Sequence, residues 1–567
     1  MIRRLLALVL IAALSACATD RPATAPTSAT APPRVMVAAA NPLAVEAGLR
    51  VLRAGGSAID AAVAVQAVLG LVEPQSSGIG GGSYMVYYDA RTRRVTAYDG
   101  RETAPSGASP DMFTGPDGRP IGFFAAVLSG RSTGVPGAVA MLAQAQSDHG
   151  VLPWSGLFDD GIRLAEQGFA VSPRLAGMIA SGAPQAGTPD ALAYFTRPDG
   201  RRYGPGDTLV NAAYGQTLRS IASTGPSALY SGQIAQDISA RVRQGDLPGT
   251  LSTADIAAYR PIVAPALCRP YRIYMVCTDN PASSGVSLLQ ALAMLEHTDI
   301  NRRGPTDPVA WVQIAEAERL MYADRDRFVG DPAFVNTPVA GLLNPVYVAS
   351  RARLIGDRIG PVPTFGTLPS ATVFGPDHTR EPGGTSHFVV VDARGNVVSM
   401  TTTVESLFGS GRMVHGFFLN NQLTDFSFAP RDADGQPAAN AVAAGKRPRS
   451  SMSPVIVLDR QGRFVAALGS PGGSSILSYN LKALVGILDW NMTVQDAFAL
   501  PNMVARGASF SSEPERFAPG VVEALATRGL VLRPGGGENS GLHGVRAIPG
   551  GLQGGADPRR EGVALGY

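Results

Sequence analysis

The most restrictive feature of the sequence is a set of short β-rich runs that begins near residue 384. SHFVVVD and VVSMTTT flank the turn sequence DARGN, and SPVIVLD and FVAALGS flank DRQG. Runs of this length, separated by turns rich in Asp and Gly, are typical of antiparallel β-hairpins. Two such hairpins require a sheet at the centre of the fold, covered by the helices that the rest of the sequence supplies.

Helical patterns lie on both sides of these runs in the sequence. Asn41-Pro42 predicts a helix start, because a capping side chain is followed by proline at the first helical position. Gly55-Gly56 predicts the end of that helix. Ser57 then caps a second expected helix over 58–69, whose faces are almost all small or apolar and therefore buried. The sequence predicts a layered α+β core with the sheets inside.

Composition excludes some classes of function. The chain has 567 residues, 45% apolar and 16% charged, which is typical of globular proteins. A formal charge of +3 is too small for the dense basic face that nucleic acid binding needs. The six His are scattered, with no CxxC or HExxH spacing, so we expect no metal site.

The first seventeen residues indicate export. A charged start is followed by an apolar run over 5–14, which is too short to span a bilayer and is typical of a signal peptide. The closing Leu-Ser-Ala-Cys resembles a bacterial lipobox, in which Cys17 would be lipidated; the alternative is an ordinary secretory signal with a chance Cys. Residues 18–34, rich in Ala, Thr and Pro, predict a disordered tether. We expect an exported, periplasmic protein, held at the membrane only by a lipid anchor.

Two further cysteines, Cys268 and Cys277, lie in a stretch that predicts a hairpin turning at 269–272. That turn places Cys268 beside the turn and Cys277 several residues up the return strand. At about 3.3 Å per residue the two thiols are expected to be too far apart to bond. The prediction is therefore two free thiols.

The most reactive arrangement in the sequence is Gly383-Gly384-Thr385-Ser386-His387. Two glycines allow backbone geometry that other residues resist, so a Thr385 hydroxyl beside a strained carbonyl could attack it. Cleavage would then give Thr385 a free α-amine, whose pKa near ~7.7–8.0 suits it to act as general base for its own hydroxyl. Taken alone, the same residues also fit a tight turn that enters a strand.

Eight sequence pieces, taken in order, decide between these interpretations. From about residue 36 to the C-terminus the chain resembles the γ-glutamyltranspeptidase family of N-terminal-nucleophile hydrolases. The pieces that carry the resemblance are EPQSSGIGGGSYMV (73–86), YDGRETAP (98–105), NPASSGVSLLQ (280–290), ADRDRFVGDP (323–332), GGTSHFVVVDARGNVVSMTTT (383–403), LNNQLTDF (419–426), KRPRSSMSP (446–454) and GSPGGSS (469–475).

The resemblance implies catalytic roles at four positions. Thr385 matches the family nucleophile and cleavage point, and Thr403 matches the Thr that orients it. A turn at 393–396 would bring those two strands side by side. Gly472 and Gly473 match the glycines whose amides form the oxyanion hole, where the missing Cβ permits close approach.

The resemblance also implies a binding site for the glutamyl group. Arg101 matches the Arg that binds its α-carboxylate, a pairing that suits the planar guanidinium, and Ser450 and Ser451 match the serines that bind the same group. Gln422 and Asp425 match the residues that receive the α-ammonium. Without the resemblance, Arg101 and Asp425 would be interpreted as solvated surface charges.

Two positions depart from the family pattern. Glu405 stands where many members have Asn, and as a strand residue two positions beyond Thr403 it is expected to face the same side, near Asp425. The stretch 429–445, which matches a lid over the site, has no aromatic residue. The second departure leaves open which acceptor is preferred and how tightly the lid closes.

The resemblance implies a four-layer αββα sandwich, made as one precursor and cut into a large chain (35–384) and a small catalytic chain (385–567) that stay together. The expected activity is transfer of the γ-glutamyl group of glutathione or a related compound, through a Thr385 ester, to water or to an amino acid or peptide acceptor, without a cofactor. Two alternatives stay open: a sister amidase of the cephalosporin or glutaryl acylase type, and a catalytically silent lipoprotein of the same fold.

Overall fold

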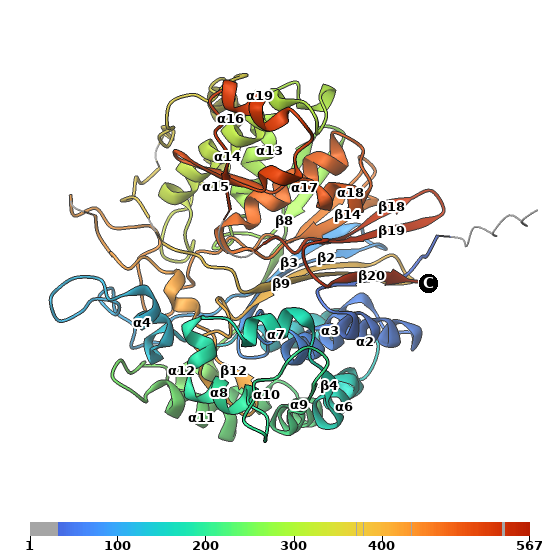
Figure 1. Ribbon diagram of the computed structural model, residues 1–567, viewed down its shortest axis with the longest axis vertical. Coiled ribbons are helices and arrows are strands. Elements are labelled where there is room, and N and C mark those ends of the chain that lie inside the picture. The colour runs from blue at the N-terminus through green and yellow to red at the C-terminus, as the bar shows by residue number, and fades with distance from the viewer. Residues whose placement is uncertain (1–31, 370, 378, 433, 536–538) are drawn as a thin grey trace, which may run out of the picture. The chain divides into compact units, whose positions relative to one another are not determined.

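Two antiparallel sheets form the centre of residues 33–567 (Figure 1). The computed structural model describes residues 32–369, 371–377, 379–432, 434–535 and 539–567. The predicted signal peptide (1–17), its Cys17 and nearly all of the predicted tether (18–34) lie outside the described residues. Of the helices described, none is both long enough and apolar enough to cross a membrane.

The first sheet has seven strands, each antiparallel to its neighbour. Their order across the sheet is β20 (Val563–Gly566), β1 (Met36–Ala39), β9 (Thr385–Val391), β10 (Val397–Thr403), β2 (Gly82–Asp89), β3 (Arg94–Gly100) and β6 (Ile262–Pro265). The predicted hairpin over 386–403 is therefore β9 and β10, at the middle of this sheet.

The second sheet has six strands and is also antiparallel throughout. Their order is β19 (Gly551–Ala556), β18 (His543–Ile548), β14 (Phe464–Gly469), β13 (Val455–Leu458), β8 (Tyr274–Thr278) and β7 (Leu267–Tyr271). The second predicted hairpin is β13 and β14. The chain crosses directly from the first sheet to the second between β6 and β7.

Alternation of side chains along the strands builds three apolar layers. Val389 and Val391 of β9 pack against Ile456 and Ala467 of the second sheet, in the layer between the two sheets. Their neighbour Val390 faces the other way, into a core shared with helices of the first half of the chain. Alternate residues of β13 and β14 likewise face helices on the outer side of the second sheet. The arrangement is a four-layer αββα sandwich, which confirms the predicted fold (Figure 1).

The helices of the first outer layer begin as the sequence predicts. Asn41 accepts a hydrogen bond from the Leu43 amide at the start of α2 (Pro42–Arg53). Ser57 and Asp60 cap each other's amides at the start of α3 (Ala58–Val72), all of whose residues are buried. The same apolar core includes residues of α5 (Ala138–His149), α6 (Asp159–Gln167), α7 (Pro173–Ile179), α8 (Pro189–Phe195), α9 (Ala212–Thr224), α10 (Ser227–Tyr230), α11 (Gly232–Val242) and α12 (Thr253–Ala258).

The second sheet packs against α13 (Gly285–Leu295), α14 (Pro308–Phe328) and α17 (Ile476–Leu488). The remaining helices are α4 (Phe123–Leu128), α15 (Val339–Leu342), α16 (Pro345–Ala352), α18 (Val494–Ala499) and α19 (Val521–Thr527). Short strands outside the two sheets are β4 (Phe169–Ala170), β5 (Thr208–Leu209), β11 (Met413–Val414), β12 (Phe417–Phe418), β15 (Met503–Arg506), β16 (Ser509–Ser512) and β17 (Arg533–Pro534).

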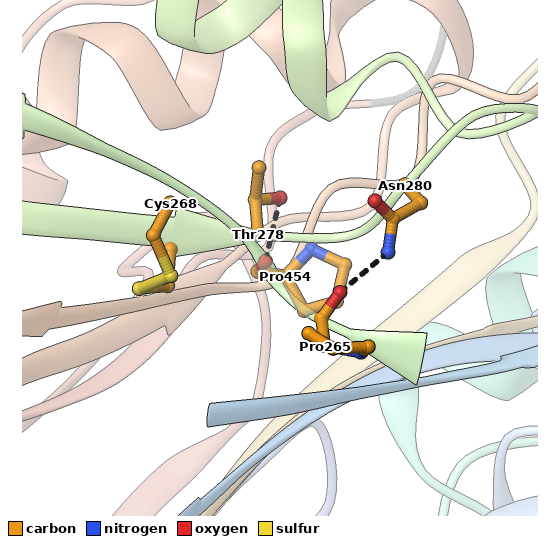
Figure 2. The surroundings of a disulfide bond; sticks show 6 residues. Pro265, Cys268, Thr278, Asn280 and Pro454 are labelled. Atoms are coloured by element: carbon orange, nitrogen blue, oxygen red, sulfur yellow. Dashed lines mark hydrogen bonds between the residues drawn. A yellow bond between two sulfur atoms is a disulfide. The ribbon is translucent and has the colours of Figure 1, made fainter. Parts of the chain in front are cut away.

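The prediction of two free thiols is wrong, because Cys268 and Cys277 form a disulfide (Figure 2). The error lies in the turn. Strands β7 and β8 pair Tyr271 with Tyr274, so the turn consists of Arg272 and the residue after it instead of 269–272. That register places the two cysteines directly opposite each other, at equal distances from the turn.

Candidate active site

The hairpin β9–β10 places Thr385 directly opposite Thr403, and both strands are buried along their whole length. The Thr385 Oγ1 donates to Thr403 Oγ1 at 3.1 Å, and Thr403 Oγ1 donates to the Gly384 carbonyl at 2.7 Å. The amide of Glu405 donates to the same Thr403 hydroxyl at 2.8 Å. Thr403 therefore contacts both the Thr385 hydroxyl and the carbonyl oxygen of the peptide bond that precedes it.

Gly384 could not be another residue here. A Cβ at this position would stand 2.2 Å from the Glu405 carbonyl oxygen and 2.6 Å from the carbonyl carbon of Ser406. Both are backbone atoms that cannot move aside easily. The glycine therefore lets the chain approach Thr385 along the 405–406 backbone, where Thr403 holds the carbonyl that precedes Thr385.

Residues from six separate parts of the sequence line one pocket at Thr385, which we call the threonine pocket. Its lining is Arg101, Glu381, Pro382, Thr385, Thr403, Glu405, Gln422, Asp425, Ser450, Ser451, Met452, Gly473 and Ile476. The space left between them is about 20 Å³, enough for about one water molecule. The structure thus brings together every predicted site residue of the described chain except Gly472.

Arg101 and Asp425 are buried, 1% and 5% exposed, so the alternative of solvated surface charges is wrong. Arg101 follows β3 and donates to Asp425 at 2.6 Å and to the Arg449 carbonyl at 2.8 Å. Gln422 donates to the same Asp425 oxygen at 2.6 Å, within the short 3-10 helix Gln422–Asp425. The charges of Arg101 and Asp425 therefore satisfy each other in this structure.

Glu405 lies beside Asp425, but not for the reason predicted. Strand β10 ends at Thr403, and Glu405 has a φ of 84°, so a left-handed turn and not strand alternation brings it there. Its carboxyl accepts from Asn421 and is hydrogen-bonded to Asp425. Burial, and then the charge of Asp425, raise the pKa of Glu405 well above its ordinary value. The neighbouring Asp425 thus disfavours the ionised form of Glu405.

Ser450 is held through its backbone, and Ser451 is held through its hydroxyl group. Ser284 Oγ donates to the Ser450 carbonyl at 2.6 Å, and the Ser450 amide donates to Ala282 at 3.0 Å. Ser450 Oγ accepts from the Met452 amide at 3.1 Å. The Ser451 hydroxyl donates to Glu381 and accepts from Arg325 at 2.7 Å.

Gly472 and Gly473 lie between β14 and α17 with φ values of 133° and 56°, which favour glycine. A Cβ on Gly473 would stand 2.1 Å from the Glu381 carbonyl oxygen. Gly472 lines a neighbouring cavity of about 560 Å³, which shares Glu381 and Pro382 with the threonine pocket. The segment that precedes Thr385 therefore covers the glycine turn and divides the two spaces.

Sequence reasoning assigned no role to Arg325, Glu381 or Asn421, although each contacts a predicted site residue. Two signals were available. Arg325 lies in ADRDRFVGDP, one of the pieces that carry the family resemblance, and Glu381 lies four residues before Thr385.

The αββα sandwich, with a buried hydroxyl at the start of a central strand, defines an N-terminal-nucleophile hydrolase. Among solved structures, the chain is similar to a cephalosporin acylase from Bacillus halodurans (TM-score 0.83, 26% identity, covering 97% of this chain and 98% of that one). It is also similar to a gamma-glutamyltranspeptidase from Helicobacter pylori (TM-score 0.53, 31% identity, covering 59% and 91%). The sequence matches the family described as Gamma-glutamyltranspeptidase over residues 44–567, and the chain belongs to that family.

Relatives along nearly the whole length agree with this assignment. The chain is 36% identical to a glutathione hydrolase proenzyme of Bacillus subtilis, covering 94% of this chain and 91% of the relative. It is 33% identical to a glutathione hydrolase proenzyme of Escherichia coli, covering 94% and 92%. It is also 34% identical to an Acylase ACY 1 proenzyme of a Pseudomonas strain, covering 88% and 87%. The protein is therefore an enzyme, and its relatives include proteins named glutathione hydrolase and a protein named acylase.

Proposed function

We propose that this enzyme cuts itself between Gly384 and Thr385 and then hydrolyses or transfers the γ-glutamyl group of glutathione and related amides. One observation carries the proposal. The Thr385 hydroxyl, held by Thr403, faces a pocket whose walls hold a buried guanidinium, Arg101, and buried carboxyl groups, Glu405 and Asp425. A substrate with a carboxylate and an ammonium on one carbon meets the opposite charge at each group.

Self-cleavage begins with attack of Thr385 Oγ on the Gly384 carbonyl carbon. The hydrogen bond from Thr403 stabilises negative charge on the Gly384 oxygen as it develops. The C–N bond then breaks, the nitrogen takes the proton that the Thr385 hydroxyl gives up and becomes the α-amine, and the acyl group is left as an ester on Thr385 Oγ. Water hydrolyses that ester and leaves a large chain that ends at Gly384 and a small chain (385–567).

Turnover repeats the same chemistry on substrate. The new α-amine, whose reference pKa is ~7.7–8.0, takes the proton of the Thr385 hydroxyl as the oxygen attacks the γ-carbonyl. The amides of Gly472 and Gly473 stabilise the oxyanion, and the protonated amine product leaves. Water, an amino acid or a peptide then attacks the ester, releasing the glutamyl group.

The glutamyl group is proposed to bind with its two charged groups on separate contacts. Arg101, Ser450 and Ser451 receive the α-carboxylate. Gln422, Asp425 and Glu405 receive the α-ammonium. No cofactor takes part in these steps.

A donor comparison tests this function. Purified two-chain enzyme should release nitroaniline from γ-glutamyl-p-nitroanilide far faster than from glutaryl-p-nitroanilide, which lacks only the α-ammonium. The Asp425→Asn variant should narrow that preference, because it removes a carboxylate that would bind the ammonium. Faster release from the glutaryl donor would instead assign the enzyme to the acylases.

The acylase alternative has specific support. The structural match to the cephalosporin acylase is high, and the stretch 429–445 carries no aromatic side chain to close over a small glutamyl group. The buried Asp425 and Glu405 favour the glutamyl substrate, because a glutaryl group has no ammonium to offset their charge. A catalytically silent protein of the same fold would remain a single chain.

Export and lipid anchoring belong to the proposal as well. The signal-like residues 1–17 end on Cys17, and the Pro-rich tether follows. The Cys17→Ser variant should leave the membrane fraction and lose labelling by palmitate. Absence of label from the unaltered protein would refute lipidation and leave only an ordinary secretory signal.

A further inference from the structure

A carboxylate of the chain itself occupies one side of the threonine pocket in the uncut protein. The Glu381 side chain is 5% exposed and pairs with Arg325 at 2.7 Å, while Ser451 donates to its second oxygen. Arg449 stands 3.6 Å from the first oxygen. Both guanidinium side chains are fully buried. We call Arg325, Arg449 and Ser451 the anion site.

The anion site is a built site, not a chance ion pair. Arg325 also donates to Ser284 Oγ at 2.8 Å, and Ser284 in turn holds the Ser450 carbonyl. A single hydrogen-bonded row therefore links the guanidinium of α14 to both serines that line the threonine pocket. This row fixes where a carboxylate in the anion site would stand relative to Thr385.

Charge balance in the anion site depends on Glu381. Burial by itself would raise the pKa of Glu381, but Arg325, Arg449 and the hydrogen bonds from Ser451 and Arg325 lower it to about 2. Without Glu381, the described carboxylates that pair with Arg325 or Arg449 are Asp326 and Asp377. Arg506 also pairs with Asp326, so three guanidinium groups would face two carboxylates. A buried positive charge left over in this way favours uptake of an anion.

Glu381 also stands where it blocks substrate. It lies three residues before the cut, and with Pro382 it reduces the threonine pocket to about 20 Å³. Its carbonyl accepts from the Ser474 amide at 3.3 Å beside the glycine turn. A glutamyl group cannot enter until the 381–384 segment has moved out, which the cut permits by freeing its C-terminal end.

We propose that Glu381 is a built-in stand-in for the substrate's α-carboxylate, and that Arg325 is a substrate-binding residue which passes from Glu381 to that carboxylate after the cut. This inference rests on the proposed glutamyl function. It adds a second cation to Arg101 on the side of the pocket where the serines lie. It also predicts that the uncut chain, whose pocket is filled by Glu381, does not bind substrate.

The uncut state is tested with a small carboxylate. In the non-cleaving background Thr385→Ala, the added change Glu381→Ala vacates the anion site. Acetate should then raise the Tm by about 1–2 °C at 100 mM and constant ionic strength, whereas acetamide should not. Thr385→Ala alone should show no rise, and a further Arg325→Gln change should abolish it. Equal effects of acetate with and without Glu381 would overturn the inference.

The cut state is tested by comparing two donors that differ only in the α-carboxylate. Arg325→Lys keeps the charge but loses the planar fork, so KM for γ-glutamyl-p-nitroanilide should rise about tenfold or more with kcat nearly unchanged. KM for 4-aminobutanoyl-p-nitroanilide, which lacks only the α-carboxylate, should change less than twofold. Arg319→Lys is the control, because Arg319 is equally buried on α14 but pairs with Glu316 outside the pocket.

The outcomes separate this inference from the proposed function. Equal KM changes for both donors would mean that Arg325 is structural and would overturn its role in binding. If the unaltered enzyme released nothing from the γ-glutamyl donor, the proposed function would fail, while the acetate shift would still report on Glu381. If Arg325→Lys failed to fold or cut, the acetate experiment alone would decide.

Discussion

The carboxyl groups on the two sides of the threonine pocket have pKa values shifted in opposite directions. On the acidic side, Glu405 and Asp425 lie together, and burial raises the pKa of each. On the basic side, Arg325 and Arg449 lower the pKa of Glu381 to about 2 despite its burial. Arg101 lies between them, bonded to Asp425 on one side and to the carbonyls before Ser450 on the other.

The difference shows how the buried charges of one site are compensated while no substrate is bound. The acidic side is satisfied by the ion pair of Asp425 with Arg101 and by the raised pKa of Glu405, which favours its neutral form. The basic side cannot lose a proton at ordinary pH, so it is satisfied by a carboxylate of the chain. Each side therefore predicts a different response to mutation.

The Thr385→Ala change should have the largest effect, because without the cut Glu381 stays in the threonine pocket and excludes substrate. Thr385→Ala lacks the attacking hydroxyl, so the protein should remain one uncut chain with no measurable turnover. Gel electrophoresis and a nitroaniline assay measure both. N-terminal sequencing of the small chain of the unaltered enzyme should give Thr-Ser-His-Phe, and any other start would contradict the mechanism.

Removal of the residue between the two sides should have the next largest effect. Arg101→Ala should still cut itself, because no glutamyl group takes part in that step. Its kcat/KM for a γ-glutamyl anilide should fall by the equivalent of roughly 2–5 kcal/mol, mainly through KM. Arg94→Ala is the control, because Arg94 is an exposed arginine at the start of β3, the strand that Arg101 follows. An unchanged KM would remove Arg101 from substrate binding.

Neutralising the acidic side should have a moderate, pH-dependent effect. Because the pKa of Glu405 is raised in the empty site, lowering the pH through that value protonates it and weakens binding of an ammonium. The kcat/KM of the unaltered enzyme should therefore fall toward acidic pH. Glu405→Gln should raise KM modestly, flatten that acidic limb and leave self-cleavage intact. Identical pH profiles would show that Glu405 does not contact substrate.

Opening the disulfide should have the smallest effect on catalysis. Strand β8 continues toward the loop that holds Ser450, but it also pairs with β13, which keeps it in place without Cys268–Cys277. Cys268→Ser with Cys277→Ser should destabilise the hairpin by roughly 2–3 kcal/mol and change kcat/KM less than twofold. Thermal unfolding and a donor assay test this. A large rise in KM would mean that the basic side depends on the hairpin.

Much of the fold and of the site could be predicted because local patterns coincide with the final contacts. Capping at Asn41 and Ser57 and the alternation of β9 and β10 are decided by neighbouring residues. The register of paired strands, and which distant side chain fills a pocket, are not decided by neighbouring residues. The disulfide depended on a one-residue detail of a turn, and Glu405 reached Asp425 through a left-handed residue. No local pattern indicates that Glu381 fills the pocket.

The strand order of the first sheet has a consequence for the mature enzyme. Strand β1, from the part before the proposed cut, is hydrogen-bonded on one edge to β20 and on the other to β9, both from the part after it. Pulling the two products apart would break both ladders, so dissociation and unfolding would be the same event. Once cut, the enzyme would have to refold as a two-body reaction that depends on concentration, whereas the intact precursor folds as one body. After cleavage, unfolding would therefore be harder to reverse, and the lifetime of the mature enzyme would be set by how slowly it unfolds.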